Sequence, residues 1–357
     1  MQIQETTSDI SNVGNQQRLN KPNYTELTIM KGIAILLVIF HHSICDFPIN
    51  IKANIPSFID VFITIFFMHI FFVVSVFLFK AEYTFTALLK KKVSRLLIPY
   101  LTFGFLNQTS RIIFGSITRS TPPSYSEAVL RLLTGQTYWF LYSLLVIMII
   151  AYWIITFAKK LKTNNFISIV FSLVLYYISQ YCLPESNLLT SIKSSFQYLP
   201  YFLLGYALKT YYSQIKRHFI KYPTYITIIC FIFITIISIY HNKISNNLCY
   251  YFIPIIGVLG TYTFSLIAIK YLTMLLTPCL EYFGKYSLQY YLNHMLISLP
   301  CFYCAYFLKL ASWPSLFLIF FAILSLSFLM LTIENKINFF QYICGINSNY
   351  CNKFQLS

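Results

Sequence analysis

The sequence predicts an all-α, polytopic integral membrane protein with about ten transmembrane helices and both termini in the cytoplasm. Three observations support this fold class. Of the 357 residues, 57% are hydrophobic and only 10% are charged, a composition outside the range of ordinary soluble domains. Apolar stretches of about 20 residues, the length that spans a bilayer, recur along the chain. Lys and Arg gather in alternate connections between these stretches.

Ten stretches have the length and apolarity of a spanning helix, although the third carries the polar side chains of Asn107, Gln108 and Arg111. An even number of spans places both termini on one side of the membrane. The stretches cover residues 28–46, 58–80, 96–116, 138–158, 165–183, 196–212, 222–240, 250–272, 286–309 and 313–333.

The distribution of basic residues predicts which side holds the termini. With the N-terminus inside, 19 of the 26 Lys and Arg residues fall in inside connections and 7 fall outside. This is the pattern of the positive-inside rule. The formal net charge of +16 therefore reflects topology, and we expect no nucleic-acid partner. The predicted location is the inner, cytoplasmic membrane of a bacterial-like cell, with membrane lipids as partners.

The predicted domain organisation is one membrane domain between two tails. Residues 1–24 are polar and lack the basic and apolar regions of a cleaved signal, so we expect a disordered cytoplasmic tail. Residues 25–340 are expected to form the transmembrane domain, and residues 341–357 a cytoplasmic C-terminal tail. The oligomeric state does not follow from the sequence.

The nine Cys residues are odd in number and scattered, mostly within apolar stretches. This distribution is typical of cysteines that pack as small apolar side chains in a membrane-protein core. It is not typical of a disulfide framework or a zinc site. The sequence therefore predicts no metal.

Ionisable residues inside a span are costly, and each is a candidate for function. Lys31 and His42 in the first span are eleven residues apart, which puts them on one helix face with His42 about 16 Å farther along the axis. His69 in the second span and His294 in the ninth reach a similar depth. Three histidines are thus expected in one layer around a shared polar cavity. The alternative is that Lys31 extends to the headgroups and the histidines only bond to neighbouring helices.

The predicted inner face carries the basic run "KKKVSRLLIPY", in which Lys92 and Arg95 share a helix face. These two residues either anchor the helix against anionic lipid or clamp a phosphate. Ser75 lies nearer the cytoplasm than His69 on the second predicted span. Considered alone, it is typical of a hydroxyl that hydrogen-bonds back to its own helix.

Aromatic residues open the fourth span at its predicted outer end, where Tyr138 and Trp139 stand in "GQTYWFLYSLL". Such residues usually form the interfacial aromatic belt. Aromatic faces also stack on sugar rings, so a role in binding a carbohydrate is the second interpretation.

Taken in order, these stretches resemble the acyltransferase family 3 membrane proteins, which O-acylate surface polysaccharides and related acceptors. "KGIAILLVIFHHS" is similar to the family's first span, with Lys31 in the basic place and His42 in the histidine place. "FFMHIFFVVSVFLF" is similar to its second span, and "KVSRLLIPY" to its basic motif, with Lys92 and Arg95 in the basic places. The similarity covers nearly the whole chain after residue 24. It continues with "WFL" at Trp139, "YFLLGY" at Tyr201 to Tyr206 and "FGKYSLQYYLNH" at Phe283 to His294.

The sequence departs from the family pattern at three places. An Asp before the Gly of the first motif is Thr28 here, with Glu26 nearby. In the second span Phe67 stands at the His place and His69 at the Pro place. These two positions face about 200° apart on a helix, so His69 is not assumed to replace the missing histidine. The family's small Gly after Ser75 is Val76 here.

The resemblance implies transfer of an acyl group, most often acetyl from acetyl-CoA, to a hydroxyl of a carbohydrate. The acceptor would be an O-antigen, capsule or exopolysaccharide unit, free or lipid-linked, and acyl-CoA is the expected donor. His42 would act as the general base. The resemblance groups the candidates as catalytic His42, Ser75 and His294; cofactor-binding Lys31, Lys92 and Arg95; and substrate-binding His69, Tyr138 and Trp139.

Three alternatives stay open at this stage. A covalent acyl-His or acyl-Ser intermediate would replace direct transfer. A transporter or flippase of a lipid-linked sugar or small metabolite would also have about ten spans and a polar midplane, although the sequence shows neither internal repeats nor paired broken helices. A non-enzymatic partner of an envelope assembly would need neither Lys31 nor His42.

Overall fold

A computed structural model describes residues 24–45, 57–114, 122–184, 186, 189–240, 247–272, 274–310 and 313–346. The structure is 86% helix and has no strand in these ranges, which confirms the all-α prediction. The predicted N-terminal tail, apart from Tyr24, and most of the predicted C-terminal tail lie outside the described residues. The C-terminal tail was predicted from residue 341, and that position falls inside the last described helix, α17 (Asn338–Ile343).

Each of the ten predicted stretches contains a helix in the described part of the chain. The second stretch is broken into three pieces, and the others are single helices. They are α2 (Thr25–Cys45); α3 (Ser57–Thr64), α4 (Phe67–Ser75) and the 3-10 turn η2 (Val76–Leu78); α6 (Ile98–Phe114); α8 (Trp139–Lys160); α9 (Asn165–Cys182); α10 (Thr190–Thr210); α12 (Pro223–Ile239); α13 (Asn247–Tyr271); α15 (Ser287–Phe307); and α16 (Trp313–Lys336).

Shorter helices connect these elements. The four α-helices among them all carry basic residues in their last turns. The connecting elements are α5 (Phe85–Lys92) with the π-helical segment η3 (Val93–Leu97), α7 (Tyr125–Leu133), α11 (Tyr212–Phe219) and α14 (Leu276–Lys285).

Six helices in the described ranges are long and apolar enough to cross a membrane, or seven if the bent pair α11 and α12 counts as one span. The count of ten and the orientation with both termini inside stay predictions. Helices outside the six include α6, which buries Asn107 and Gln108, and α15, which buries Gln289, Asn293 and His294. The 17 residues of α6 are fewer than the about 20 that span a bilayer, and the buried polar side chains of α15 lower its apolarity.

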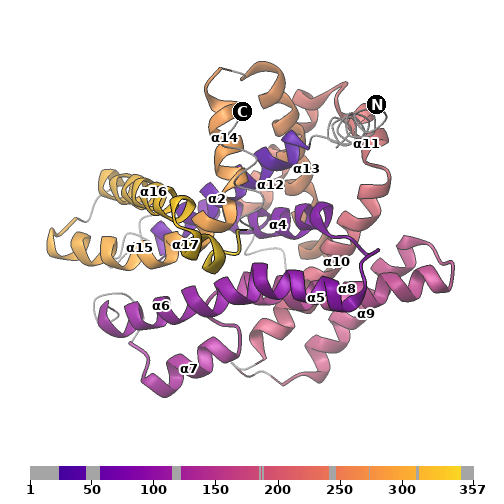
Figure 1. Cartoon of the computed structure of the whole chain (residues 1–357). Helices are drawn as coiled ribbons and strands as arrows, with labels where there is room; N and C mark the ends of the chain where they lie inside the picture. Colours follow the sequence, from indigo (N-terminus) through magenta and orange to yellow (C-terminus); the bar gives the residue numbers. More distant parts are fainter. Residues whose placement is uncertain are drawn as a thin grey trace, which may run out of the picture.

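Helix α2 lies in the interior of the bundle and packs against α4, α13, α14, α15 and α16. In the view of Figure 1, α2 and α4 lie between α13 and α14 on one side and α5, α6 and α8 on the other. Glycines allow the backbones of α2 and α14 to touch. A Cβ on Gly32 would lie 2.0 Å from the carbonyl oxygen of Leu280, and one on Gly284 would lie 1.8 Å from that of Thr28. This contact places the N-terminal half of α2 beside the end of α14.

Lys209 of α10 binds the backbone carbonyl groups at the C-terminal end of the second predicted span. The Lys209 ammonium donates to the carbonyl oxygens of Val76, Phe77 and Phe79 at 3.4, 3.4 and 3.0 Å. Carbonyl groups at a helix end have no partner within the helix, and the cation also complements the negative end of the helix dipole. Lys209 thereby fixes the end of the span next to Ser75.

Candidate active site

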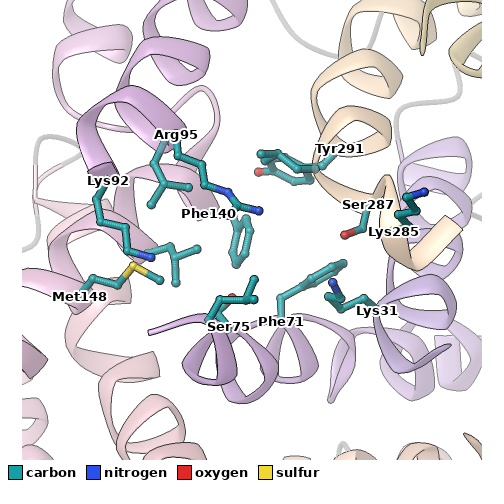
Figure 2. Close-up of a pocket in the computed structure, with 14 residues that line it drawn as sticks. Lys31, Phe71, Ser75, Lys92, Arg95, Phe140, Met148, Lys285, Ser287 and Tyr291 are labelled. Atoms are coloured by element: carbon teal, nitrogen blue, oxygen red, sulfur yellow. The ribbon is translucent and has the colours of Figure 1, made fainter. Parts of the chain in front are cut away.

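A cavity of about 110 Å³ lies where α2, α4, α8 and α15 meet the ends of α5 and α14. Four of the predicted site residues line it: Lys31, Ser75, Lys92 and Arg95. In Figure 2, Lys92 and Arg95 lie on one side of the cavity, and Lys31 lies on the opposite side. The structure therefore brings together the three residues that the resemblance assigned to the cofactor, although they come from separate helices.

A fourth basic residue at the cavity, Lys285, was not among the predicted site residues. It stands in the last turn of α14, beside α2 because of the glycine contact. The sequence contained a signal for it, since "FGKYSLQYYLNH" is one of the motifs shared with the family. Among the described residues that line the cavity none is acidic, so the cavity concentrates positive charge.

The local helix geometry directs Lys92 and Arg95 toward the cavity. Lys92 ends α5, and Arg95 lies in the π-helical segment that follows; such segments frequently occur at functional sites. Lys92 is buried, with 7% of its surface exposed, and lies outside the predicted spans. Burial, followed by the nearby Arg95 guanidinium and Lys91 ammonium, lowers the pKa of Lys92 to about 8. An anion in the cavity would relieve this cost.

The first turn of α15 also faces the cavity through Ser287 and Leu288. The N-terminal end of a helix carries a partial positive charge and favours anions. The remaining wall is apolar and comes mainly from Phe71 of α4 and from Phe140, Leu144 and Met148 of α8. The cavity thus combines a basic rim with an apolar wall.

Tyr291 connects the cavity to a pair of histidines. Its side chain lines the cavity, and its ring centroid lies 5.6 Å from that of His294. The His294 ring in turn lies 5.4 Å from that of His42, on α2. His294 Nδ1 lies 3.0 Å from the carbonyl oxygen of Tyr290. Because a carbonyl only accepts, Nδ1 carries the proton, and Nε2 holds the lone pair when the ring is neutral.

The third predicted histidine, His69, lies in a different environment. Its ring is buried, with 6% of its surface exposed, and its centroid lies 4.5 Å from that of Tyr201 and 5.0 Å from that of Tyr198. Trp139 joins the same aromatic group, 5.6 Å from Tyr198. The predicted layer of three histidines therefore contains one contacting pair, and His69 packs into an aromatic cluster. Helix spacing gives depth along the membrane but not the neighbour that a side chain faces.

Tyr138 is fully buried and lies behind the cavity wall. Its ring centroid is 5.7 Å from that of Tyr291, and its hydroxyl donates to the carbonyl oxygen of Leu292 at 2.8 Å. This bond joins the start of α8 to the middle of α15. Tyr138 therefore positions the helix that carries Tyr291 and His294.

Glu26, which stands near the place of the family's Asp, is separate from the cavity. Its carboxylate is buried, accepts from the Tyr212 hydroxyl and lies 2.7 Å from the Lys216 ammonium. This network ties the start of α2 to α11. Thr28, at the place of the family's Asp, is likewise not among the residues that line the cavity.

The fold and the cavity define a multi-pass membrane protein with a basic cavity beside a histidine pair. The model of the acyltransferase domain of acyltransferase family 3 matches residues 24–332, nearly the whole chain. The chain belongs to this family and is a membrane acyltransferase. Comparison with curated proteins and with solved structures gave no match.

Proposed function

We propose that this acyltransferase moves an acetyl group from acetyl-CoA to a hydroxyl group of a cell-surface carbohydrate, such as an O-antigen, capsule or exopolysaccharide unit. The observation that carries the proposal is the convergence of Lys31, Lys92, Arg95 and Lys285 on one cavity without an acidic lining residue. Like charges gathered at one cavity are unfavourable together unless an anion joins them, and the cost is greatest for Lys92, the buried member of the set. Coenzyme A is such an anion, because it carries several phosphate charges.

The donor would bind with its phosphates at the basic rim. Arg95 offers a planar fork for two phosphate oxygens, and the lysines act as point charges. The pantetheine arm is thin and largely uncharged, so it suits the apolar wall formed by Phe140, Leu144 and Met148. This arrangement directs the thioester toward Tyr291 and the histidines beyond it. With the N-terminus inside, the rim faces the cytoplasm, where CoA is available.

The histidine pair would supply the base. His42 accepts the proton of the acceptor hydroxyl as its oxygen attacks the thioester carbonyl; the C–S bond breaks, and the CoA thiolate takes up a proton. His294 lies against His42 with Nδ1 committed to the Tyr290 carbonyl, which keeps its ring in one orientation. Ser75 lines the donor cavity and would contact the donor in direct transfer, or carry the acyl group in a two-step reaction.

The test uses the purified full-length protein in liposomes with radiolabelled acetyl-CoA and glycan from the cell of origin. The proposal expects release of the CoA thiol only when the glycan is present, together with label in the glycan. Label trapped on the protein without acceptor would indicate the two-step reaction. If the protein binds CoA but releases no thiol with any hydroxyl acceptor, while moving a lipid-linked sugar across the bilayer, the transporter alternative would be correct.

A further inference from the structure

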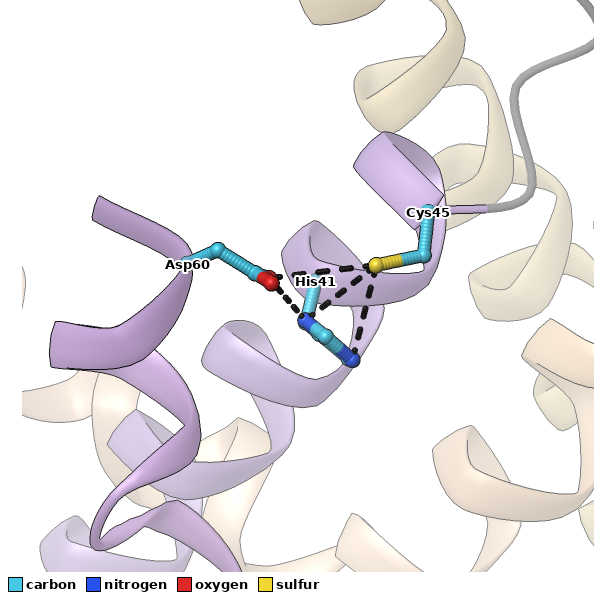
Figure 3. Close-up of side chains that lie close together, drawn as sticks. All are labelled: His41, Cys45 and Asp60. Carbon is cyan, nitrogen blue, oxygen red and sulfur yellow. Dashed lines mark hydrogen bonds and ion pairs between the residues drawn. The ribbon is translucent and has the colours of Figure 1, made fainter. Parts of the chain in front are cut away.

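Three side chains with metal-binding atoms meet at the C-terminal end of α2, away from the residues that line the cavity. His41 and Cys45 are one helical turn apart on α2, and Asp60 lies on α3. The His41 Nδ1 atom is 2.9 Å from Asp60 Oδ1. Cys45 Sγ is 3.7 Å from His41 Nδ1 and 3.8 Å from Asp60 Oδ1. Figure 3 shows the three side chains converging from the two helices.

These three distances match one face of a zinc coordination tetrahedron. Zinc bonds of about 2.0 to 2.3 Å at tetrahedral angles place neighbouring nitrogen, oxygen and sulfur ligands about 3.3 to 3.6 Å apart. The observed edges of 2.9, 3.7 and 3.8 Å differ from this by a few tenths of an ångström. A shift of that size is within the reach of side-chain torsions, with no movement of the backbone.

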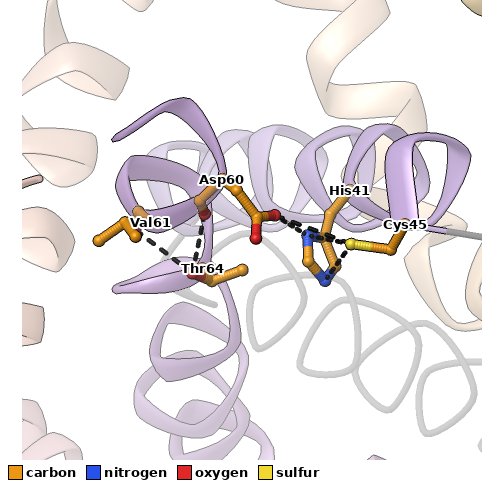
Figure 4. Close-up of polar contacts among 5 residues, drawn as sticks. All are labelled: His41, Cys45, Asp60, Val61 and Thr64. Carbon is orange, nitrogen blue, oxygen red and sulfur yellow. Dashed lines mark hydrogen bonds and ion pairs between the residues drawn. The ribbon is translucent and has the colours of Figure 1, made fainter. Parts of the chain in front are cut away.

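The cluster is both held in place and open to an entering ion. Thr64 Oγ1 donates to the carbonyl oxygens of Asp60 and Val61 at 2.8 and 3.3 Å, which closes the last turn of α3 (Figure 4). The His41 ring packs 5.7 Å from Phe67. The side chains of His41 and Asp60 are 19% and 25% exposed, so an ion can reach them without unfolding.

The chemistry of the ligands selects the metal. A thiolate and an imidazole favour zinc and similar borderline-soft cations, whereas Mg²⁺ and Ca²⁺ prefer oxygen ligands alone. Three protein ligands would leave a fourth position for water, as in catalytic zinc sites.

A Cys-His-Asp nucleophile system is the competing interpretation of the same residues. In such a system the thiol must point along the lone pair of one imidazole nitrogen. Cys45 Sγ instead lies 3.7 Å from both Nδ1 and Nε2 of His41, so it lies on the lone-pair direction of neither nitrogen. The geometry therefore favours a shared ion over a base-activated thiol.

We propose that His41, Cys45 and Asp60 bind one Zn²⁺ ion. Binding replaces the thiol proton of Cys45, which leaves to solvent, and the ion joins the end of α2 to α3 beside His42. The proposal departs from the sequence-based expectation of no metal. A search of cysteine spacing does not find the site, because the third ligand lies 15 residues beyond Cys45 on another helix.

The test measures metal binding directly, independently of acyl transfer. The full-length protein in detergent, freed of metal by a chelator, is titrated with Zn²⁺ and with Co²⁺. We expect one ion per chain and a sulfur-to-cobalt charge-transfer band in the Co²⁺ spectrum. Cys45→Ser should abolish the band, and His41→Ala or Asp60→Asn should weaken binding at least about tenfold. The matched controls Cys182→Ser and His218→Ala alter exposed residues of the same types and should bind like the wild type.

A second measurement needs no variant and is therefore independent of any folding defect. Zn²⁺ should slow alkylation of Cys45 in the wild-type protein and leave alkylation of Cys182 unchanged. If the ion binds with equal affinity to all three variants, or leaves the alkylation rate of Cys45 unchanged, the site is not a zinc site. Rapid alkylation of Cys45 that depends on His41 and is insensitive to Zn²⁺ would instead support the nucleophile interpretation.

Discussion

The imidazole rings of His42 and His294 lie 5.4 Å apart although 252 residues separate them along the chain. One ring is on the interior helix α2, and the other is on α15. Tyr291, also on α15, contacts His294 and lines the cavity. The pair thus lies at the end of the path from the basic rim. The His42 ring is half-buried, and the His294 ring is fully buried.

His42→Ala is therefore expected to lower acyl transfer by about 10² to 10⁴-fold, the usual contribution of a general base. CoA affinity should stay within about twofold, since His42 does not line the donor cavity. Initial rates of glycan labelling and calorimetric CoA titration on the same preparation separate the two effects. Full transfer by a correctly inserted His42→Ala protein would remove His42 from the mechanism.

Lys285 provides a sharper test of the donor site, because it was identified from the structure. Lys285→Ala should weaken CoA binding by about 10 to 100-fold, the value of a charge-assisted hydrogen bond to phosphate. The loss should shrink at high salt, as expected when a charge interaction is screened. Calorimetry at two salt concentrations measures both effects.

The control for this experiment is Lys159→Ala, an exposed lysine at the end of α8, which should leave CoA affinity unchanged. Equal affinity of Lys285→Ala and the wild type would show that the phosphates do not reach α14.

Much of this arrangement could be predicted from the sequence. Apolar length located a helix in every predicted span, and the basic residues Lys31, Lys92 and Arg95 were recognised by their motifs. These signals are local, because a helix length or an i, i+3 pair is a property of consecutive residues.

The remaining features depend on contacts between helices. No single segment of the sequence encodes the burial of His69 among tyrosines. The same is true of the position of Lys285 opposite Lys92. The same holds for α15: polar residues that face the protein interior and polar residues that face water have equal effects on hydropathy, so hydropathy alone does not identify this helix as a span.

The pH dependence of donor binding follows from Lys92. Its pKa is lowered to about 8 by burial first and by Arg95 and Lys91 next. The group is charged below that pH and neutral above it, so CoA affinity should fall as the pH rises through about 8. A bound phosphate favours the charged form, so CoA binding above that pH should be accompanied by proton uptake.

Lys92→Arg is the diagnostic variant, because a guanidinium stays charged over this whole range. Its affinity for CoA should fall less than that of the wild type between about pH 7 and 9.5, because the group at position 92 no longer loses its charge. Calorimetry in buffers of different ionisation enthalpy reports both the affinity and the protons taken up. A wild-type affinity that does not change across this range would exclude Lys92 as a phosphate ligand.

The glycine contact between α2 and α14 explains why Lys31 and Lys285 face one cavity, and it can be tested by stability. A Cβ on Gly32 would lie 2.0 Å from the backbone oxygen of Leu280, and rigid backbone cannot yield as a side chain can. Gly32→Ala should therefore lower the thermal midpoint and destabilise the fold by at least about 1 to 3 kcal/mol. Gly104→Ala is the matched control, because its Cβ would meet the end of the flexible Leu132 side chain at 2.5 Å. Thermal unfolding followed by intrinsic fluorescence, with and without CoA, compares the two. If Gly32→Ala is as stable as Gly104→Ala and binds CoA normally, the close approach of α2 and α14 is not what builds the donor site.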